Sequence, residues 1–376
     1  MTSDFGCAAI RKLMNQAETS SPWLREMALK WNRIRSAQEN VFGCIGRTPL
    51  VELRRICRAE GISLKILAKL EYMNPTGSLK DRIYHEMITR AIARGDLKPG
   101  MEILEASTGN AGIACAFVAK MLGYPATIVL PSGMSQERMK LIRAYGAKIV
   151  NTPGAESDVD LSIKKIEELK RDNPGKYWEP AQFTNADNIN AHYKTTGPEI
   201  WEQMKGKVDC FVASQGTGGT VTGVGKFLRK KNRKVLLYAV EPTEAPILAR
   251  RRWGTHKIEG IGDGFVPRNL HLKLLNGVVT TTSEEALSMA RQLSTTEGIF
   301  CGISSGCNVA AAVKIARKHP RLRTIVTMIN DTGQRYFSTE LCGEGKTVEI
   351  PEREHPLDDY SLSELDKYQS SWEIIE

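Results

Sequence analysis

The chain has 376 residues, of which 41% are hydrophobic and 25% charged. This composition is typical of globular proteins and excludes collagen-like and disordered chains. With 52 basic and 43 acidic residues the net charge is +9, so the surface attracts anions. The basic residues form short separate clusters without interleaved aromatics, so nucleic acid is not an expected partner.

The N-terminus is polar and predicts neither a secretory signal nor a membrane anchor. No apolar run approaches the roughly 20 residues that cross a bilayer, so we expect a cytoplasmic protein without a membrane partner. Residues 1–40 are expected to form a helical N-terminal extension, because apolar residues between Trp23 and Trp31 recur at helical spacing. The eight cysteines lack Cys-x-x-Cys spacing, which predicts reduced thiols and no metal site.

Short β-branched runs alternate along the chain with amphipathic stretches, which is typical of α/β proteins with a parallel sheet. The runs fall into two series and therefore indicate two α/β units. The strands are expected at 64–70, 102–104, 126–130, 209–213, 235–239 and 324–328, and the helices at 79–94, 111–122, 136–145, 221–229 and 309–317.

The turn Asn74-Pro75-Thr76-Gly77-Ser78 leads directly into a predicted helix with Lys80 in its first turn. Unpaired N–H groups and the helix dipole make a helix start positive, which favours a neutral amine over an ammonium. Such a lysine can form a Schiff base with an aldehyde. An ordinary surface lysine is the alternative, and the residue alone does not decide between them.

The segment Ser107-Thr108-Gly109-Asn110-Ala111 follows a predicted strand and opens a predicted helix. Its hydroxyls, its side-chain amide and the N–H groups of the helix start converge on one spot, as in a carboxylate-binding loop. A helix with an ordinary serine or threonine cap explains the same residues equally well.

A third loop, Gly216-Thr217-Gly218-Gly219-Thr220, again lies between a predicted strand and a predicted helix. Glycines let the backbone close around an anion, so this segment predicts a phosphate cradle. It lacks the Gly-Lys-Ser/Thr of a Walker A loop and the complete glycine pattern of a dinucleotide site. We therefore expect a phosphate monoester.

The segment Cys301-Gly302-Ile303-Ser304-Ser305-Gly306 precedes a further helix rich in small residues. A serine at such a turn can hydrogen-bond a ring nitrogen without protonating it. A simple helix cap formed by one of the two serines is the alternative.

A pyridoxal phosphate enzyme requires a nucleophilic lysine, a carboxylate-binding loop, a phosphate cradle and a neutral hydroxyl partner for the ring nitrogen. The sequence resembles the cysteine synthase (O-acetylserine sulfhydrylase) and cystathionine β-synthase family of pyridoxal-phosphate-dependent enzymes. The resemblance extends from Cys44 to about Thr339 and includes Thr195–Trp201 and His256–Gly262. It implies a tryptophan-synthase-β-like α/β fold (fold type II), with pyridoxal 5'-phosphate in the cleft between two α/β domains.

The resemblance also implies a role for each motif. Lys80 would bind the cofactor covalently and move the substrate's α-proton, Asn110 would bond the ring hydroxyl, and Ser304 the ring nitrogen. The phosphate would be bound by Gly216, Thr217, Gly218, Gly219 and Thr220. The substrate would be bound by Ser107, Thr108, Gly109, Asn110 and Gln182.

By the same resemblance, residues 41–72 and 185–345 form a larger cofactor-binding domain and residues 73–184 a smaller mobile one. Residues 346–376 remain as an acidic C-terminal tail that we expect to be loosely packed, with Trp372 near an end that could dock elsewhere. The partners expected are an amino-acid substrate, sulfide and a second copy of the chain in a homodimer.

The implied reaction is a β-replacement in which an O-activated L-serine, O-acetylserine or O-phosphoserine, loses its leaving group to give an aminoacrylate that adds sulfide to form L-cysteine. Glu259 stands near the place where some phosphoserine-using relatives carry an arginine, whereas Arg250–Arg252 remain a candidate phosphate site. The alternatives are condensation of serine with homocysteine, a non-catalytic binding scaffold, and a nicotinamide dehydrogenase.

Overall fold

The chain builds two separate β-sheets, the larger of which has seven strands. The computed structural model describes residues 37–107, 109–154, 158–343 and 355–376. The larger sheet has the strand order β1-β2-β10-β7-β8-β9-β11, in which only the β1 and β2 pair is antiparallel. Its strands are β1 (Leu50–Glu52), β2 (Lys65–Leu70), β7 (Cys210–Ser214), β8 (Leu236–Pro242), β9 (Gly277–Thr281), β10 (Thr324–Ile329) and β11 (Glu373–Ile375).

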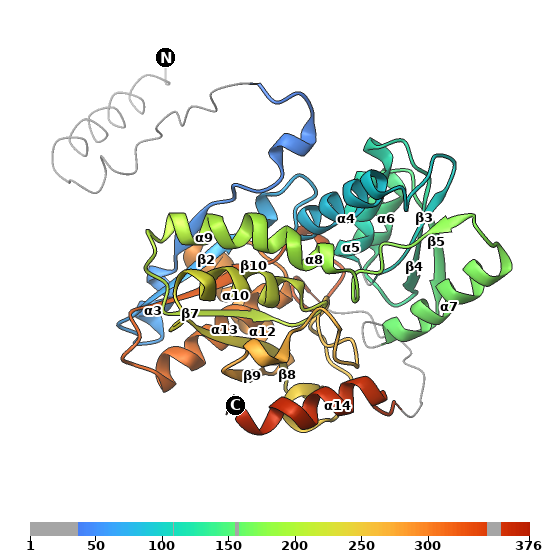
Figure 1. Cartoon of the computed structure of the whole chain (residues 1–376). Coiled ribbons are helices and arrows are strands. Elements are labelled where there is room, and N and C mark those ends of the chain that lie inside the picture. Colours follow the sequence, from blue (N-terminus) through green and yellow to red (C-terminus); the bar gives the residue numbers. More distant parts are fainter. Residues whose placement is uncertain (1–36, 108, 155–157, 344–354) are drawn as a thin grey trace, which may run out of the picture. The chain divides into compact units, whose positions relative to one another are not determined.

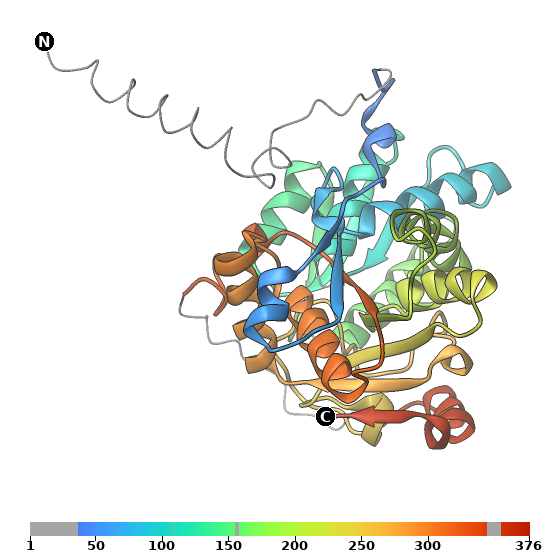
Figure 2. The ribbon, with the colours of Figure 1, turned by 90° about the vertical axis from the view of Figure 1, so that its left-hand side faces the viewer.

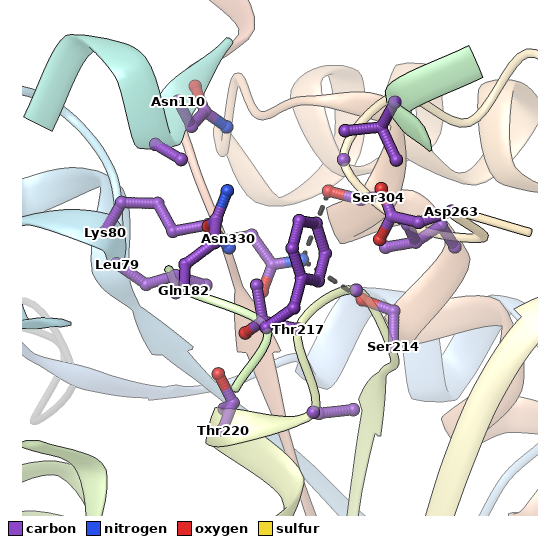
Figure 3. A pocket seen from close by; sticks show the side chains of 18 residues that line it. Leu79, Lys80, Asn110, Gln182, Ser214, Thr217, Thr220, Asp263, Ser304 and Asn330 are labelled. Atoms are coloured by element: carbon purple, nitrogen blue, oxygen red, sulfur yellow. Dashed lines mark hydrogen bonds between the residues drawn. The ribbon is translucent and has the colours of Figure 1, made fainter. Parts of the chain in front are cut away.

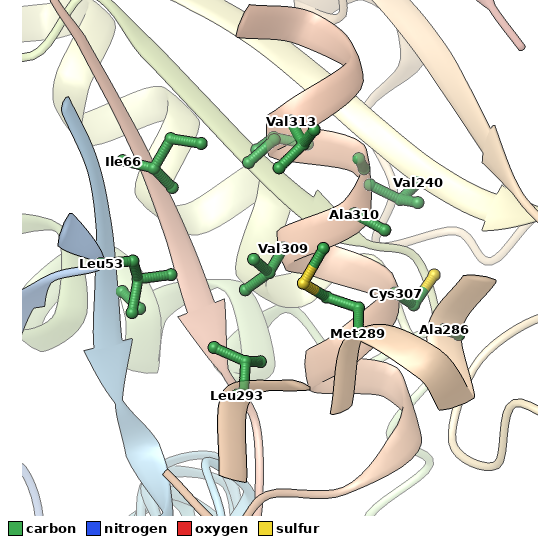
Figure 4. Packing of buried hydrophobic residues seen from close by; sticks show 14 of the residues in the cluster. Leu53, Ile66, Val240, Ala286, Met289, Leu293, Cys307, Val309, Ala310 and Val313 are labelled. Atoms are coloured by element: carbon green, nitrogen blue, oxygen red, sulfur yellow. The ribbon is translucent and has the colours of Figure 1, made fainter. Parts of the chain in front are cut away.

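The central strands of this sheet are nearly continuous apolar runs because helices cover both of their faces. Successive side chains of a strand point to opposite faces, and in β10 Ile325 packs in one hydrophobic cluster while Val326 packs in the other. Figure 4 shows part of the first cluster, in which Val309 lies between Leu53 and Met289 in this view.

The helices divide between these two clusters. Helices α3 (Arg54–Ala59), α12 (Ser283–Gln292) and α13 (Ile303–Lys318) contribute buried residues to the first, whereas α9 (Gly197–Gln203), α10 (Gly219–Lys231), α11 (Ile247–Arg250) and α14 (Asp359–Tyr368) contribute to the second. Helix α8 (Ala186–Ala191) continues through a π-helical turn, His192–Thr196, into α9, and a second π-helical turn, Leu293–Glu297, follows α12. Short 3-10 turns occupy Val41–Cys44, Glu71–Met73, Leu272–Leu274, Gly333–Tyr336 and Gln369–Ser371.

The smaller sheet is entirely parallel, in the order β5-β4-β3-β6. Ile166 packs on one of its faces against Leu104 and Val129. On the other face a Cβ at Gly112 would lie only 2.7 Å from Ile128, so this glycine lets its helix approach the sheet closely. The elements are β3 (Glu102–Ala106), β4 (Ala126–Pro131), β5 (Lys148–Thr152) and β6 (Tyr177–Trp178), with α4 (Lys80–Arg94), α5 (Asn110–Met121), α6 (Gln136–Ala144) and α7 (Val159–Asp172), as Figure 1 shows.

The expected strands and helices are all present, with ends that differ by a few residues. One difference is the antiparallel strand β1, which lies at the edge of an otherwise parallel sheet, a common arrangement in large α/β sheets. The expected helix within residues 1–40 falls almost entirely outside the described residues. No described helix is both long enough and apolar enough to cross a membrane.

The expectation of a loosely packed C-terminal tail is wrong for residues 355–376. Strand β11 extends the larger sheet by pairing in parallel with β9, and the red C-terminal strand beside the sheet is visible in Figure 2. Leu365 and Trp372 are buried in the second hydrophobic cluster. Tyr238 donates a 2.6 Å hydrogen bond to Glu373. The acidic residues within 355–376 therefore belong to a segment with a packed helix and strand, and the docking of the Trp372 end is confirmed.

Candidate active site

A cavity that is partly open to solvent brings most of the sequence motifs together. Three of its polar lining residues lie at or just beyond the carboxyl ends of parallel strands, namely Asn110 after β3, Ser214 in β7 and Asn330 after β10. Ligands of open α/β folds bind at such strand ends.

Lys80 is the first residue of α4 and lines this cavity. Backbone contacts to the end of β10 fix the preceding turn. The N–H of Leu79 donates to the carbonyl of Asn330 at 2.9 Å, and Ser78 forms an antiparallel bridge with Asp331. The helix that begins with Lys80 is thus attached directly to β10, an interior strand of the larger sheet.

A buried ion network holds the first turn of α4 from its other side. Arg82 pairs with Glu71 at 2.7 Å and with Glu199 at 2.7 Å, and Lys69 pairs with the same Glu199 at 2.7 Å. Burial by itself would raise the pKa of Glu199, but Arg82 and Lys69 outweigh it and lower that pKa to about 2. The pKa of Glu71 is also lowered, because Arg82 outweighs the effect of burial. Both carboxylates therefore stay charged and anchor the helix that begins with Lys80.

The glycine-rich loop Gly216–Thr220 connects β7 to α10, and four of its five residues line the cavity. Gly218 has φ +79° and ψ −12°, in the left-handed region that favours glycine. Two side chains from outside the loop hold its threonines. Asn188 donates to Thr217 at 2.9 Å, and His192 lies 3.2 Å from Thr220.

His192 and Asn188 are contacts that the sequence motifs did not indicate. His192 is completely buried, and burial lowers its pKa to about 3, so the imidazole is neutral. Its other ring nitrogen lies 2.9 Å from Thr196 in the same π-helical turn. Such turns often occur at functional sites. The only signal available in the sequence was the position of His192 a few residues before the segment Thr195–Trp201.

In the loop after β3, Ser107 was expected to bind the substrate, but its hydroxyl has other partners. The hydroxyl of Ser107 accepts hydrogen bonds from the N–H groups of Gly109 at 3.0 Å and Gly112 at 2.7 Å. It therefore caps the start of α5, and Ser107 is fully buried and does not line the cavity. Thr108 lies outside the described residues. Gly109 has φ +153°, and a Cβ there would overlap the side chain of Arg138.

Asn110 is the residue of this loop that lines the cavity. Its amide nitrogen donates to Asp331 at 2.6 Å, and its oxygen accepts from Arg335. Gln182 reaches the cavity from the loop before α8 and donates to the carbonyl of Ala106 at 3.0 Å. The side-chain oxygen of Gln182 is buried and has no hydrogen-bond partner among the described residues, so a ligand or a water has to satisfy it.

Ser304 enters the cavity from the first turn of α13. Asn330 donates to its hydroxyl at 3.1 Å and to that of Ser214 at 3.3 Å, and Figure 3 shows both contacts as dashed lines. Because Ser304 accepts one hydrogen bond in this way, its own proton remains available for an acceptor in the cavity.

Asp263 also lines the cavity and was missed as a site residue. It is buried, with 6% exposure, and lies between Gly262 and Gly264, which both have positive φ. Burial raises its pKa to about 6, although the charge of Lys80 acts in the opposite direction. The signal in the sequence was a single acidic residue inside a glycine-rich loop.

Glu259 and the cluster Arg250–Arg252, the two sequence features that concern a phosphorylated substrate, do not line the cavity. Glu259 forms an ion pair with Arg138, which also donates to the hydroxyl of Tyr336 at 2.7 Å. Arg250 pairs with Glu376 and Arg251 pairs with Asp366, so the arginine cluster binds the C-terminal segment. None of these arginines lines the cavity.

The residues present fit pyridoxal phosphate. A lysine amine can hold its aldehyde, the N–H groups of a glycine-rich loop can hold its phosphate, and a hydroxyl with a free proton can bond its ring nitrogen. The buried oxygen of Gln182 is a polar atom that awaits a partner. All of these groups surround one cavity.

Comparisons with known proteins agree with this fit. A family model described as pyridoxal-phosphate dependent enzyme matches residues 41–331. Cysteine synthase A of Escherichia coli is 47% identical over 309 residues, covering 80% of this chain and 94% of the relative, and cysteine synthase of Staphylococcus aureus is 42% identical over 304 residues, covering 81% and 96%. The crystal structure of O-acetylserine sulfhydrylase isoform 3 of Entamoeba histolytica superposes with a TM-score of 0.78 at 39% identity, covering 90% of this chain and 98% of that one.

The chain belongs to the pyridoxal-phosphate-dependent enzyme family. The expected tryptophan-synthase-β-like fold and the expected cofactor are thereby confirmed. The predicted resemblance to cysteine synthases is confirmed as well.

Proposed function

We propose that this enzyme makes L-cysteine from O-acetyl-L-serine and sulfide. One observation carries the proposal. Lys80, the Gly216–Thr220 loop and Ser304 surround one cavity in a chain that is 47% identical to a cysteine synthase. The acetyl leaving group is favoured over phosphate because Arg138, Arg250 and Arg251 have acidic partners. Neither these three nor Arg252 lines the cavity.

Each of the site residues has a separate role in the proposed reaction. Lys80 would hold the aldehyde carbon of the cofactor until the substrate amine takes its place, and the freed Lys80 amine would then remove the proton from the substrate Cα and later return it. Gly216, Thr217, Gly218, Gly219 and Thr220 bind the phosphate through N–H and hydroxyl groups. Bound in this way, pyridoxal phosphate supplies an electron sink that weakens the bonds at the substrate Cα and Cβ.

The ring and the substrate carboxylate have separate partners. Ser304 donates to the ring nitrogen without adding charge to it, which suits β-elimination. Asn110 bonds the ring hydroxyl and, together with Thr108, Gly109 and Gln182, binds the carboxylate. Ser107 contributes by fixing the N–H groups of Gly109 and Gly112.

A substrate assay tests the proposal directly. Purified protein loaded with pyridoxal phosphate is supplied with sulfide and either O-acetylserine or O-phosphoserine, and cysteine is measured. We expect O-acetylserine to be the better substrate of the two. Lys80→Ala should abolish turnover and the covalent attachment of the cofactor, whereas Lys120→Ala, at an exposed position, should not. Full turnover by Lys80→Ala would refute the mechanism.

We further propose that residues 73–184, which contain the smaller sheet, form a domain that closes on the substrate carboxylate through the loop 107–111. The larger domain then comprises residues 41–72 and 185–345. A crystal structure with bound substrate and an unchanged position of the smaller sheet would count against this division.

We also propose that the enzyme is a cytoplasmic homodimer, as in the family it resembles. Sedimentation of the purified protein should give about twice the mass of one chain. A monomer mass at micromolar concentration would contradict the dimer, and a fluorescent fusion found outside the cytoplasm would contradict the location.

A further inference from the structure

Basic residues that are far apart in the sequence come together at one edge of the larger sheet. Strands β10, β7 and β8 are neighbours and run parallel to one another. The segments that lead into them are residues 319–323, 206–209 and 231–235. Neighbouring strands lie about 4.8 Å apart, so the three strand starts fall within about 10 Å. We call these three segments together the basic edge.

Six cations of the basic edge are exposed to solvent, and none of them pairs with an acidic side chain among the described residues. The Debye length at physiological ionic strength is about 8 Å, so charges on neighbouring strand starts reinforce one another. They create one local positive field that attracts anions. The six are Lys207, Lys231, Arg233, Lys234, Arg321 and Arg323.

The basic edge contains a single acid, Asp209, and backbone groups already engage it. Its carboxylate accepts hydrogen bonds from the N–H of Arg323 at 2.8 Å and from that of Thr324 at 3.1 Å. Its carbonyl accepts from the N–H of Leu236 at 2.9 Å. Asp209 therefore holds the starts of β7, β10 and β8 together, and its charge is used within the fold.

The basic edge lies at the opposite ends of the strands from the active-site cavity. Ser214 ends β7 and Asn330 follows β10, and both line the cavity. A strand rises about 3.3 Å per residue, so the six residues of β10 place the basic edge about 20 Å from the cavity. This distance exceeds the Debye length, so the basic edge does not steer substrate anions into the cavity. A ligand bound there leaves the cavity open.

The composition of the basic edge favours a polypeptide ligand over a nucleic acid. Single-stranded nucleic acids stack their bases on aromatic side chains, and the three segments contain no phenylalanine, tyrosine or tryptophan. The major groove of duplex DNA admits a helix or a β-ribbon, whereas the basic edge consists of short connections between elements. A second copy of the chain does not fit this face, because a two-fold axis through it would place cations against cations.

We propose that the basic edge is a docking surface for an acidic segment of another protein. This inference goes beyond the proposed function and does not depend on it. Glutamate and aspartate side chains of such a segment would pair with cations at all three strand starts, and charge complementarity of this kind sets the rate and specificity of association. Because the cavity lies at the other ends of the strands, the docked enzyme continues to turn over its substrate.

Binding of a fluorescent poly-L-glutamate peptide to the protein loaded with pyridoxal phosphate tests the inference. Fluorescence anisotropy at low ionic strength gives the dissociation constant, and added salt should weaken the binding. The variant Lys207→Glu/Arg233→Glu/Arg323→Glu reverses one exposed cation at each strand start. One exposed ion pair changes an affinity by about two- to fivefold, so this variant should bind the peptide at least about tenfold more weakly than the wild type.

A matched control separates the basic edge from the net charge. The variant Lys120→Glu/Lys140→Glu/Arg143→Glu makes the same change of net charge at exposed positions of α5 and α6, and it should keep most of the wild-type affinity. Equal losses in both variants would overturn the inference, because net charge alone would then account for the binding. The milder variant Arg233→Gln/Arg323→Gln, with the urea midpoint of the wild type, should lose affinity in the same direction.

Two further measurements identify the class of partner and the place of binding. Oligodeoxythymidine of equal charge should bind more weakly than poly-L-glutamate. Tighter binding of the oligonucleotide, lost in the same triple variant, would assign the basic edge to nucleic acid and overturn the inference, as would a wild type that does not bind poly-L-glutamate. The peptide should leave cysteine formation from O-acetylserine unchanged. Inhibition that O-acetylserine relieves would place the peptide at the cavity and contradict docking at the basic edge.

Discussion

Replacing Gly218 with alanine tests whether the backbone of the phosphate cradle is dictated by its packing. Gly218 has φ +79°. A Cβ at this position would lie 2.5 Å from the backbone nitrogen of Leu270 and 2.6 Å from its Cα. Because the contact is with backbone, no side-chain rotation can relieve it. Either the loop or the segment around Leu270 has to move.

Two unfavourable free-energy contributions add in Gly218→Ala. A left-handed conformation costs a residue with a Cβ about 1–2 kcal/mol, and overpacking costs about 1–3 kcal/mol. We therefore expect Gly218→Ala to lower the free energy of unfolding by about 2–5 kcal/mol. Gly123 provides the matched control, because it has φ +80° but nothing within 4 Å of an added Cβ. Gly123→Ala should bear only the conformational cost.

Urea unfolding of both apoprotein variants measures the difference, and titration with pyridoxal phosphate measures cofactor affinity. Gly218→Ala should unfold at a lower urea concentration than Gly123→Ala and should bind the cofactor more weakly, because the N–H groups of the cradle are displaced. Equal midpoints for the two variants, together with wild-type cofactor affinity in Gly218→Ala, would refute the packing argument.

Three further predictions concern residues around the site. The pKa of Glu199 is about 2 in the folded protein and about 4.3 in an unfolded chain, so its stabilising effect is complete above about pH 4.3 and is lost as the pH falls toward 2. The urea midpoint of Glu199→Gln should therefore lie below that of the wild type at pH 7 and approach it at acidic pH. Glu202→Gln, at an exposed position, is the control. His192→Phe removes the contact to Thr220, and because one hydrogen bond contributes about 1 kcal/mol, calorimetry should show roughly fivefold weaker cofactor binding; unchanged affinity would show that this contact does not orient the cradle. Deleting residues 355–376 exposes the edge of β9, so the truncated chain should melt at a lower temperature and aggregate more readily in light scattering; an unchanged melting temperature would contradict the packing of Leu365 and Trp372.

The sequence predicted the local units of the site well. Lys80 stands at a helix start, Gly216–Thr220 forms a loop between strand and helix, and Ser304 stands in the first turn of a helix, as their neighbours in the sequence indicate. Each of these features depends on a few consecutive residues whose conformational preferences are known. Strand and helix positions followed from hydrophobic periodicity for the same reason.

Contacts between segments that are distant in the sequence could not be predicted from the preferences of consecutive residues. Ser107 accepts from N–H groups at the start of α5, the helix that follows it, and only the backbone geometry decides between that arrangement and a turn toward the ligand. The acidic composition of residues 355–376 suggested a loose tail, but the apolar residues Leu365, Trp372 and Ile375 recur where a helix and a strand can bury them. Composition describes the average of a segment, whereas packing depends on which few residues reach a free hydrophobic surface.

The sequence by itself determined the family, the cofactor and the positions of the loops that line the cavity, because these reside in short contiguous motifs. The tertiary structure decided which side chains outside the motifs enter the cavity. His192 reaches Thr220 because α8 and its π-helical turn pack beside α10. Asp263 lines the same cavity as Lys80 although the two are 183 positions apart in the sequence. Such proximity arises from the order in which the strands pair and from burial in a shared core, and no local pattern of residues encodes it.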